Sequence, residues 1–163
     1  MTSSRTKKKS DTVTPAKVLR RFRVVFNAVR THFRQVEKQV GMGGAQVWAL
    51  NLIQQNPGIG MGGIAQQMDI HQSTASNLVK VLVQKELITL EKSTQDRRIV
   101  QLKILPAGRK VLSKVSGPFE GVLPVALGNL SGKTLERLDQ DLGALILLLQ
   151  ADETAEEVPL AEL

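Results

Sequence analysis

Cysteine is absent from this 163-residue sequence, and histidine occurs only twice. Without cysteine the chain forms no disulfide, performs no thiol catalysis and holds no thiolate-bound zinc. The two histidines, His32 and His71, lie far apart in the chain, so the sequence gives little support for a metal site. We therefore expect a protein that uses no metal and no cofactor.

Long hydrophobic runs are missing as well. No stretch of about 20 apolar residues, the length that a membrane-spanning helix needs, occurs anywhere in the sequence. Residues 1–10 are polar and rich in lysine with no apolar segment behind them, so they do not look like a secretory signal. We predict a cytoplasmic protein.

With 163 residues, 42% of them hydrophobic, the chain is long enough to bury the core of one domain.

Acidic residues are scarce at the start of the chain. Residues 1–38 hold 11 lysines and arginines, and their only acids are Asp11 and Glu37. Residues 151–163 show the reverse, with five acids and no base, and the formal net charge of the whole chain is +7. A basic body suits a polyanion such as nucleic acid or an anionic membrane. A basic protein that is merely soluble would show the same charge.

Helical periodicity dominates the first half of the sequence. Thr14 and Pro15 form a typical helix start, and Gly41 is a typical stop. Between them, apolar residues share one helical face: Val18, Phe22, Val25, Val29, Phe33, Val36 and Val40. Three further helices are expected over residues 45–55, 62–68 and 72–86.

The hydrophobic period then changes from that of a helix to that of strands. Residues 88–91 and 99–104 alternate between apolar and polar, and the polar, basic segment 92–98 joins them. This pattern predicts a β-hairpin with a long basic tip.

Two helical regions follow the predicted hairpin. The first opens at Pro106 and is kinked or interrupted by Gly117-Pro118 and Pro124. The second is capped by Ser131, and its leucines have the spacing of a coiled-coil seam: Leu135, Leu138, Leu142, Leu145 and Leu149. The predicted order is four helices, a hairpin and two helices, which is a mainly α fold with a small β-hairpin.

The third and fourth helices fit a helix-turn-helix. Ile64, Ala65, Met68 and Ile70 supply a small packed corner. The fourth helix then presents short polar side chains near its start: Gln72, Ser73, Thr74, Ser76, Asn77 and Lys80. A helix that enters the major groove reads base edges with amides and hydroxyls, and a lysine is better placed for phosphate. An ordinary polar helix surface is the alternative explanation.

The tip of the hairpin carries Asp96, Arg97 and Arg98. The carboxylate can brace one arginine while that arginine extends toward the negative potential of a narrow minor groove. A solvated ion pair is the alternative, but the hairpin directly follows the proposed recognition helix. Helix, turn, helix and basic hairpin is the order of a winged helix-turn-helix.

Between Ile64 and Gly108 the sequence resembles the MarR family of bacterial transcription regulators. The matching features are Ile64-Ala65, Met68, the Ser/Thr-rich recognition helix, Leu82, Leu87-Ile88, Asp96-Arg97-Arg98 and Gly108. The resemblance implies a homodimer in which the first and last helices intertwine, with Arg98 in the minor groove and Asp96 orienting it. Three positions depart from the family pattern, which usually has glycine where Glu86 stands, and often has arginine at Leu90 and threonine at Leu105.

The predicted domain organisation follows from these elements. Residues 1–13 form a flexible basic tail, residues 14–150 a single MarR-like domain, and residues 151–163 a frayed acidic tail. Within the domain, a winged helix-turn-helix lobe over about residues 45–108 lies between dimerisation helices over residues 15–41 and 109–150. The expected dimer interface comprises Val18, Phe22, Val25, Leu138, Leu142, Leu145 and Leu149.

The resemblance also implies a pocket between the dimer helices and the DNA-binding lobes for a small aromatic or phenolic effector. Phe26, His32 and Trp48 are candidate lining residues, and core packing is the alternative role for each. The absence of cysteine argues against the thiol-based peroxide sensing of some relatives.

Together these features predict a sequence-specific, double-stranded DNA-binding transcription regulator. By the family's default it is a repressor that acts as a homodimer on a pseudo-palindromic operator and that a small ligand releases. A winged-helix module that binds only protein and a non-regulatory DNA architectural protein are the alternatives. An enzyme is disfavoured, because the sequence has no glycine-rich phosphate loop, no thiol and no nucleophile beside a base.

Overall fold

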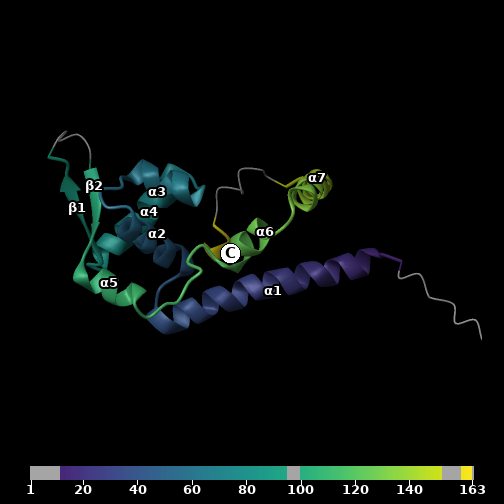
Figure 1. Ribbon diagram of the computed structural model, residues 1–163, viewed down its shortest axis with the longest axis horizontal. Helices are drawn as coiled ribbons and strands as arrows, with labels where there is room; N and C mark the ends of the chain where they lie inside the picture. Colours follow the sequence, from purple (N-terminus) through teal and green to yellow (C-terminus); the bar gives the residue numbers. More distant parts are fainter. Residues whose placement is uncertain (1–11, 95–99, 152–158, 163) are drawn as a thin grey trace, which may run out of the picture.

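Helices α2 to α5 and a two-stranded hairpin gather into one lobe, and α1 runs from this lobe toward α6 and α7 (Figure 1). The structure is a computed structural model that describes residues 12–94, 100–151 and 159–162. The elements are α1 (Pro15–Val40), α2 (Gly44–Gln55), α3 (Met61–Met68), α4 (Gln72–Gln84), β1 (Ile88–Lys92), β2 (Val100–Ile104), α5 (Pro106–Leu112), α6 (Val122–Gly128), α7 (Gly132–Leu149) and the 3-10 turn η2 (Leu160–Glu162). The predicted fold class, mainly α with a small hairpin, is confirmed.

Helix α1 begins and ends at the predicted signals. The backbone N–H of Lys17 donates to the Thr14 hydroxyl at 3.3 Å, and Pro15 occupies the first helical position, where its missing N–H costs nothing. Gly41 ends the helix in a left-handed conformation, with φ of 67°. On the predicted apolar face, Val29 and Val36 are buried, and Val18 and Val25 near the start of the helix are exposed. The other three residues of that face are half-buried: Phe22, Phe33 and Val40.

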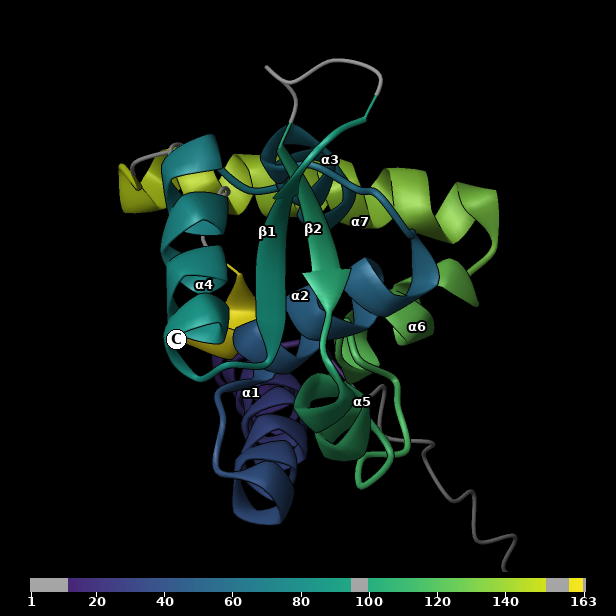
Figure 2. The same ribbon diagram turned by 90° about the vertical axis from the view of Figure 1, so that its left-hand side faces the viewer.

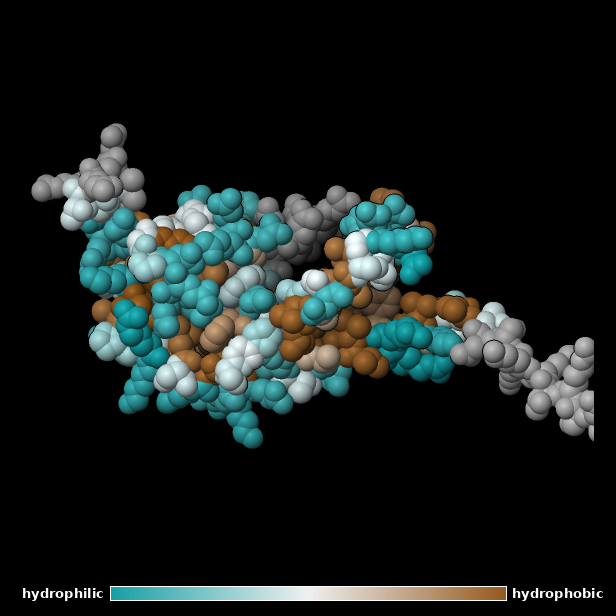
Figure 3. Space-filling model, in the orientation of Figure 1, coloured by the Kyte–Doolittle hydropathy of each residue, from teal (hydrophilic) through white to brown (hydrophobic). Residues whose placement is uncertain are grey.

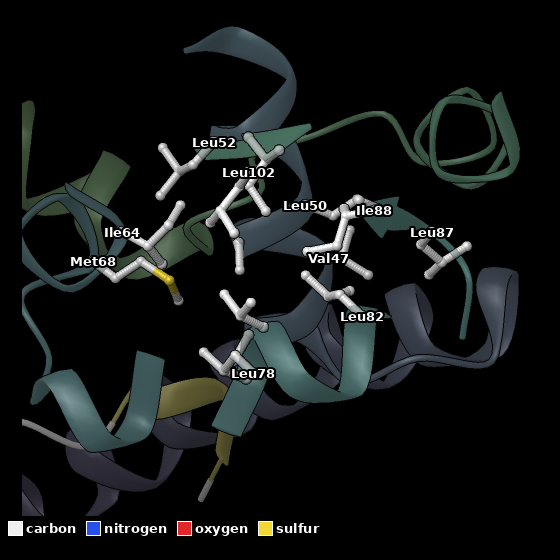
Figure 4. Packing of buried hydrophobic residues seen from close by; sticks show 14 of the residues in the cluster. Val47, Leu50, Leu52, Ile64, Met68, Leu78, Leu82, Leu87, Ile88 and Leu102 are labelled. Atoms are coloured by element: carbon white, nitrogen blue, oxygen red, sulfur yellow. The ribbon is translucent and has the colours of Figure 1, made fainter. Parts of the chain in front are cut away.

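The core of the lobe comes mainly from α2, α3, α4 and the hairpin. Leucine, isoleucine and methionine side chains from these elements point toward one another (Figure 4). The largest fully buried ones are Leu50, Ile53, Ile64, Leu82, Ile88 and Leu102. Burying each such side chain contributes about 1.5–3 kcal/mol, so this cluster fixes how α3 and α4 are presented. Trp48, on α2, is half-buried against the same cluster.

The hairpin is tied to the lobe at its base. Strands β1 and β2 pair antiparallel, with Ile88 opposite Ile104, and the Leu102 N–H donates to the Ile59 carbonyl at 2.9 Å. A Cβ at Gly108 would lie 2.5 Å from the Leu87 carbonyl oxygen, so a side chain there would push α5 away from the hairpin. The close packing explains why glycine stands at this position.

The chain after the hairpin differs from the prediction of one interrupted helix. It forms two separate helices, α5 and α6, joined by residues 113–121. This connection contains Gly117-Pro118, which is a cis peptide bond, and Gly121, whose φ of 104° no helix permits. Pro124 lies inside the first turn of α6, where proline is tolerated, so it does not break that helix. Within the described residues three α-helices therefore follow the hairpin, and the prediction of two was wrong.

Helix α7 is capped by Ser131 as predicted, because the Thr134 N–H donates to the serine hydroxyl at 3.3 Å. No residue of α7 is buried in this single chain. Figure 3 shows hydrophobic residues gathered over α1 and α6, whereas much of the lobe surface is hydrophilic. Across the described residues, no helix combines the length and the apolar character that crossing a membrane would require.

The end of the acidic segment is not frayed, contrary to the prediction. Residues 160–162 form the turn η2, which packs against both α1 and α2. Pro159 is buried, and Ala161 contacts the core cluster of the lobe. In the sequence, the apolar run Val158-Pro159-Leu160 interrupts the acids here.

Candidate nucleic-acid interface

Helix α4 has one polar face and one buried face. Ala75, Leu78, Val79 and Leu82 are buried in the lobe. The predicted contact residues lie on the opposite side: Gln72, Ser73, Asn77 and Lys80 are exposed, whereas Thr74 and Ser76 are half-buried. Five of the six lie close together by helical spacing, and Thr74 lies at the edge of the group. The buried side thus fixes the direction in which the polar side points.

The side chains on this face offer different hydrogen-bonding groups. The Ser76 hydroxyl donates to the Gln72 carbonyl at 2.8 Å, so its oxygen is left to accept. The Ser73 hydroxyl lies 3.5 Å from Nδ1 of His71. Asn77 and Gln72 carry exposed amides, the groups that pair with both N6 and N7 of adenine in a major groove. Lys80, one turn further along, offers an ammonium group suited to phosphate.

The first turn of α4 is also open to an anion. His71, at the N-cap position, makes no side-chain cap hydrogen bond to this helix, and the first turn contains no acid. Its backbone N–H groups and the positive end of the helix dipole are the features by which helices hold phosphate.

The hairpin lies beside α4 (Figure 2). The end of β1 and the start of β2 lie at the same side of the lobe as α3, whereas α1 lies at the opposite side. Asp96, Arg97 and Arg98 fall within residues 95–99, outside the residues that the structure describes. Their roles therefore stay predictions. Across the two strands, Lys103 Nζ lies 3.3 Å from Glu91 Oε1, an exposed ion pair of the kind that adds little stability.

A small apolar cavity connects the polar face of α4 to the hairpin. It has a volume of about 230 Å³, and Met61 of α3, Val83 of α4 and Leu90 of β1 contribute to its lining beside Ser76 and Lys80. Leu90, 48% exposed, stands where the resemblance to the MarR family often implies arginine. Sequence reasoning marked Leu90 as unusual and Met61 not at all, because neither belongs to the polar pattern.

A larger cavity of about 450 Å³ lies between α1 and the start of α2. Of the three predicted ligand residues, only Phe26 lines it. His32 donates from Nε2 to the Pro118 carbonyl at 3.0 Å, with the ring in the tautomer that carries that proton, and Trp48 packs on the lobe core. The structure does not bring these three side chains together around one cavity.

The cavity has further lining residues that sequence reasoning missed. Val29, Phe33, Arg30 and Arg34 line it from α1, and Leu160 and Ala161 line it from η2. The apolar run within the acidic segment is the signal that marks the last two. Helical spacing places the α1 residues on one face, but no sequence signal indicates that η2 packs over that face.

The predicted dimer residues are spread over two surfaces. On α1, Val18 and Val25 are exposed and the Phe22 ring stacks on Phe26 with 6.2 Å between ring centroids. On α7, Leu138 and Leu142 border a cavity of about 510 Å³ shared with Leu127 of α6. Leu145 is half-buried and Leu149 is exposed. These apolar side chains are therefore available for a partner.

No metal centre accompanies these surfaces in the part of the chain that the structure describes. No three histidine, aspartate or glutamate side chains come close enough together there to hold a metal ion.

Comparison with known proteins links the lobe to one family of proteins. Residues 40–99 match the family model described as "MarR family". No curated protein sequence matches the chain. Among solved structures, YusO from Bacillus subtilis is 20% identical with a TM-score of 0.52, and the alignment covers 84% of this chain and 95% of that one. A MarR family protein from Bacillus stearothermophilus is 16% identical with a TM-score of 0.52, covering 83% and 95%.

A third similar structure is the MepR–DNA complex of Staphylococcus aureus. It is 20% identical with a TM-score of 0.55, and the alignment covers 83% of this chain and 96% of that one. At this level of identity the three structures establish a shared fold. Each alignment spans more than four-fifths of the chain, so it includes α1 or later helices that lie outside the segment matched by the family model.

Proposed function

We propose that the chain is a sequence-specific, double-stranded DNA-binding transcription regulator, because its residues 40–99 match the MarR family model. The observation that carries the proposal is the geometry of α4. Its polar face is exposed and rigidly backed by the lobe core, at the helix end where phosphate and base edges are read. A DNA complex of the similar protein MepR supports the same reading.

We further propose that the regulator is a homodimer and acts as a repressor. Apolar residues along α1 and α7 lie exposed in the single chain, and covering them with a second copy would remove them from water. A two-fold dimer presents two copies of α4, so its operator is a pseudo-palindrome with half-sites about one helical turn apart. Such a protein acts where the DNA is, which in a bacterial cell is the cytoplasm.

The cavity between α1 and α2 supports release by a small ligand. It lies between the long helix proposed for dimerisation and the lobe that carries α4, so a ligand there would favour one spacing of the lobes over another. One solved structure similar to this chain, a MepR-like protein, is a complex with pseudoligands.

Selection of bound duplexes from a random DNA pool tests the proposal. The purified protein is incubated with the pool, bound duplexes are amplified, and the enriched sequences are aligned. We expect a palindromic motif with half-sites about one turn apart. A pool without enrichment would instead support a protein-binding module, and enrichment for deformable sequences without a palindrome would support an architectural protein. Either outcome overturns the proposed function.

A further inference from the structure

Residues 159–161 are seated in the groove between α1 and the start of α2. Pro159 is buried, and Leu160 and Ala161 form part of the wall of the 450 Å³ cavity there. The turn η2 contacts α1 and α2 but no other helix or strand as extensively. Seven residues separate this segment from Ala151, the second residue after α7, and its contacts with α1 place it against the first helix of the protein.

The groove is shaped to admit this segment. Gly44 is the first residue of α2, and a Cβ there would lie 3.1 Å from Ala161 Cβ and would overlap the ring of Phe33. A Cβ at Gly121 would likewise lie 2.8 Å from Cζ of the same ring. Phe33 thus packs closely on two glycines, and the bare backbone at Gly44 leaves room for Ala161 beside it.

The groove also has the charge to attract the segment. Among the described residues, its lining combines apolar side chains of α1 with two guanidinium groups, Arg30 and Arg34, and one carboxylate, Glu37. Neither arginine forms an ion pair with a residue in the described part of the chain. The sequence that leads into Pro159 is acidic and contains no base. Opposite charge and apolar surface therefore favour the same docking.

We propose that this groove is an internal docking site whose occupant is Pro159–Ala161, and that an apolar anion, such as an aromatic or alkyl carboxylate or sulfonate, competes with this segment for it. The docking follows from the contacts of η2 alone. Any effect of this docking on DNA binding rests on the function proposed above, because only a DNA-binding dimer could pass a change in the groove on to α4.

A fluorescent aromatic sulfonate, 8-anilinonaphthalene-1-sulfonate, is the probe for the first test. Deletion of residues 159–163 opens the groove. If the segment is docked about nine-tenths of the time in the full chain, the probe should bind the shortened protein roughly tenfold more tightly than the full chain. A synthetic peptide with the sequence of residues 156–163 should then displace the probe from the shortened protein. Leu148→Asp removes an exposed leucine far from the groove in sequence and serves as the matched control, with probe affinity unchanged.

Equal probe affinity for the full and shortened chains would overturn the proposal, as would a peptide that fails to displace the probe. Circular dichroism and thermal melting show whether the shortened protein is folded.

A second test uses the absence of cysteine, because an introduced thiol is the only one in the protein. Ala161→Cys places that thiol in the groove, and Ala151→Cys places it at an exposed position just after α7. We expect a disulfide reagent to label the first at least about tenfold more slowly than the second. A saturating concentration of the sulfonate should remove this protection. Equal labelling rates without the sulfonate would show that the segment is not docked.

Neither measurement involves DNA. Failure of the docking proposal therefore leaves the proposed function standing, and a random pool without enrichment leaves the docking result standing.

Discussion

Asn77 and Lys80 lie one turn apart on the exposed side of α4, yet they offer different chemistry to a nucleic acid. The amide can both donate and accept, and so can distinguish one base edge from another. The ammonium only donates and has no fixed geometry, so it responds to charge rather than to sequence. The two positions therefore separate specificity from affinity within one helix.

Replacing these residues singly should have distinct effects on operator binding. We expect Asn77→Ala to cost about 1–3 kcal/mol on the selected operator and much less on operators altered at the base that it reads. Lys80→Ala should weaken binding to all sequences alike and reduce the slope of log affinity against log salt by about 1. Fluorescence anisotropy titrations on a panel of operator variants at several salt concentrations measure both. A uniform loss for Asn77→Ala would rule out base reading by that amide.

How far single residues were predictable depends on what covers them. Helical spacing alone places Asn77 and Lys80 on a polar face, and both are exposed. Helical spacing does not reveal which residues contact an amphipathic side chain such as histidine or tryptophan. His32 and Trp48 were therefore candidates for a ligand pocket, although one hydrogen-bonds Pro118 and the other packs on the lobe core.

At the scale of elements, α4 ends in a backbone motif that sets the start of the hairpin. The Leu87 N–H donates to the Leu82 carbonyl at 3.0 Å, and the Glu86 N–H donates to the Val83 carbonyl at 2.9 Å. Both bonds define a Schellman motif, in which the residue after the cap is left-handed. That residue is Glu86, with φ of 55°. The glycine expected from the family resemblance would take this conformation without strain.

Glu86→Gly should consequently stabilise the protein. Removing the Cβ from a left-handed residue relieves about 1 kcal/mol, part of which the added freedom of the unfolded chain offsets. We expect the melting temperature to rise by about 1–3 °C. Gln84→Gly, two residues earlier in the last turn of the helix, is the control and should lower stability by about 1 kcal/mol. Calorimetry that finds Glu86→Gly less stable than the natural sequence would contradict the strain argument.

Sequence signals predicted the elements that have strong caps and a steady period. Thr14, Gly41 and Ser131 mark ends that the structure places within a residue or two. The separation of α5 from α6 was not predicted, because a proline can kink a helix, start one or end one, and the sequence does not say which. The turn η2 was missed for another reason: its packing depends on a groove built from residues more than a hundred positions earlier.

At the scale of the whole molecule, the lobe has a packed core but α1 and α7 do not complete one. The leucines of α7 fall into two groups. Leu138, Leu142 and Leu145 share one face with Leu149, whereas Leu148 lies on another face and is 84% exposed. If a second copy covers the first face, its burial provides the association energy, because each leucine removed from water contributes about 1.5–3 kcal/mol.

Leu142→Asp should therefore dissociate the proposed dimer. Because of the two-fold symmetry, each dimer contains the substitution twice. The free energy of association therefore weakens by at least ~3 kcal/mol, and the dissociation constant rises more than a hundredfold. Leu148→Asp introduces the same charge on the other face of the helix and should leave the dimer intact. Sedimentation equilibrium over a range of protein concentrations measures both variants. A dimer that survives Leu142→Asp would place the interface elsewhere.

The position of Trp48 has a practical consequence for optical measurements on this protein. The sequence contains one tryptophan and no tyrosine, so nearly all of its near-ultraviolet emission arises from a single indole. That indole is half-buried against the core of the lobe, and neither α1 nor α7 contributes another fluorophore of its kind. The emission maximum thus reports the melting of the lobe alone, and dissociation of the proposed dimer can be followed independently by scattering.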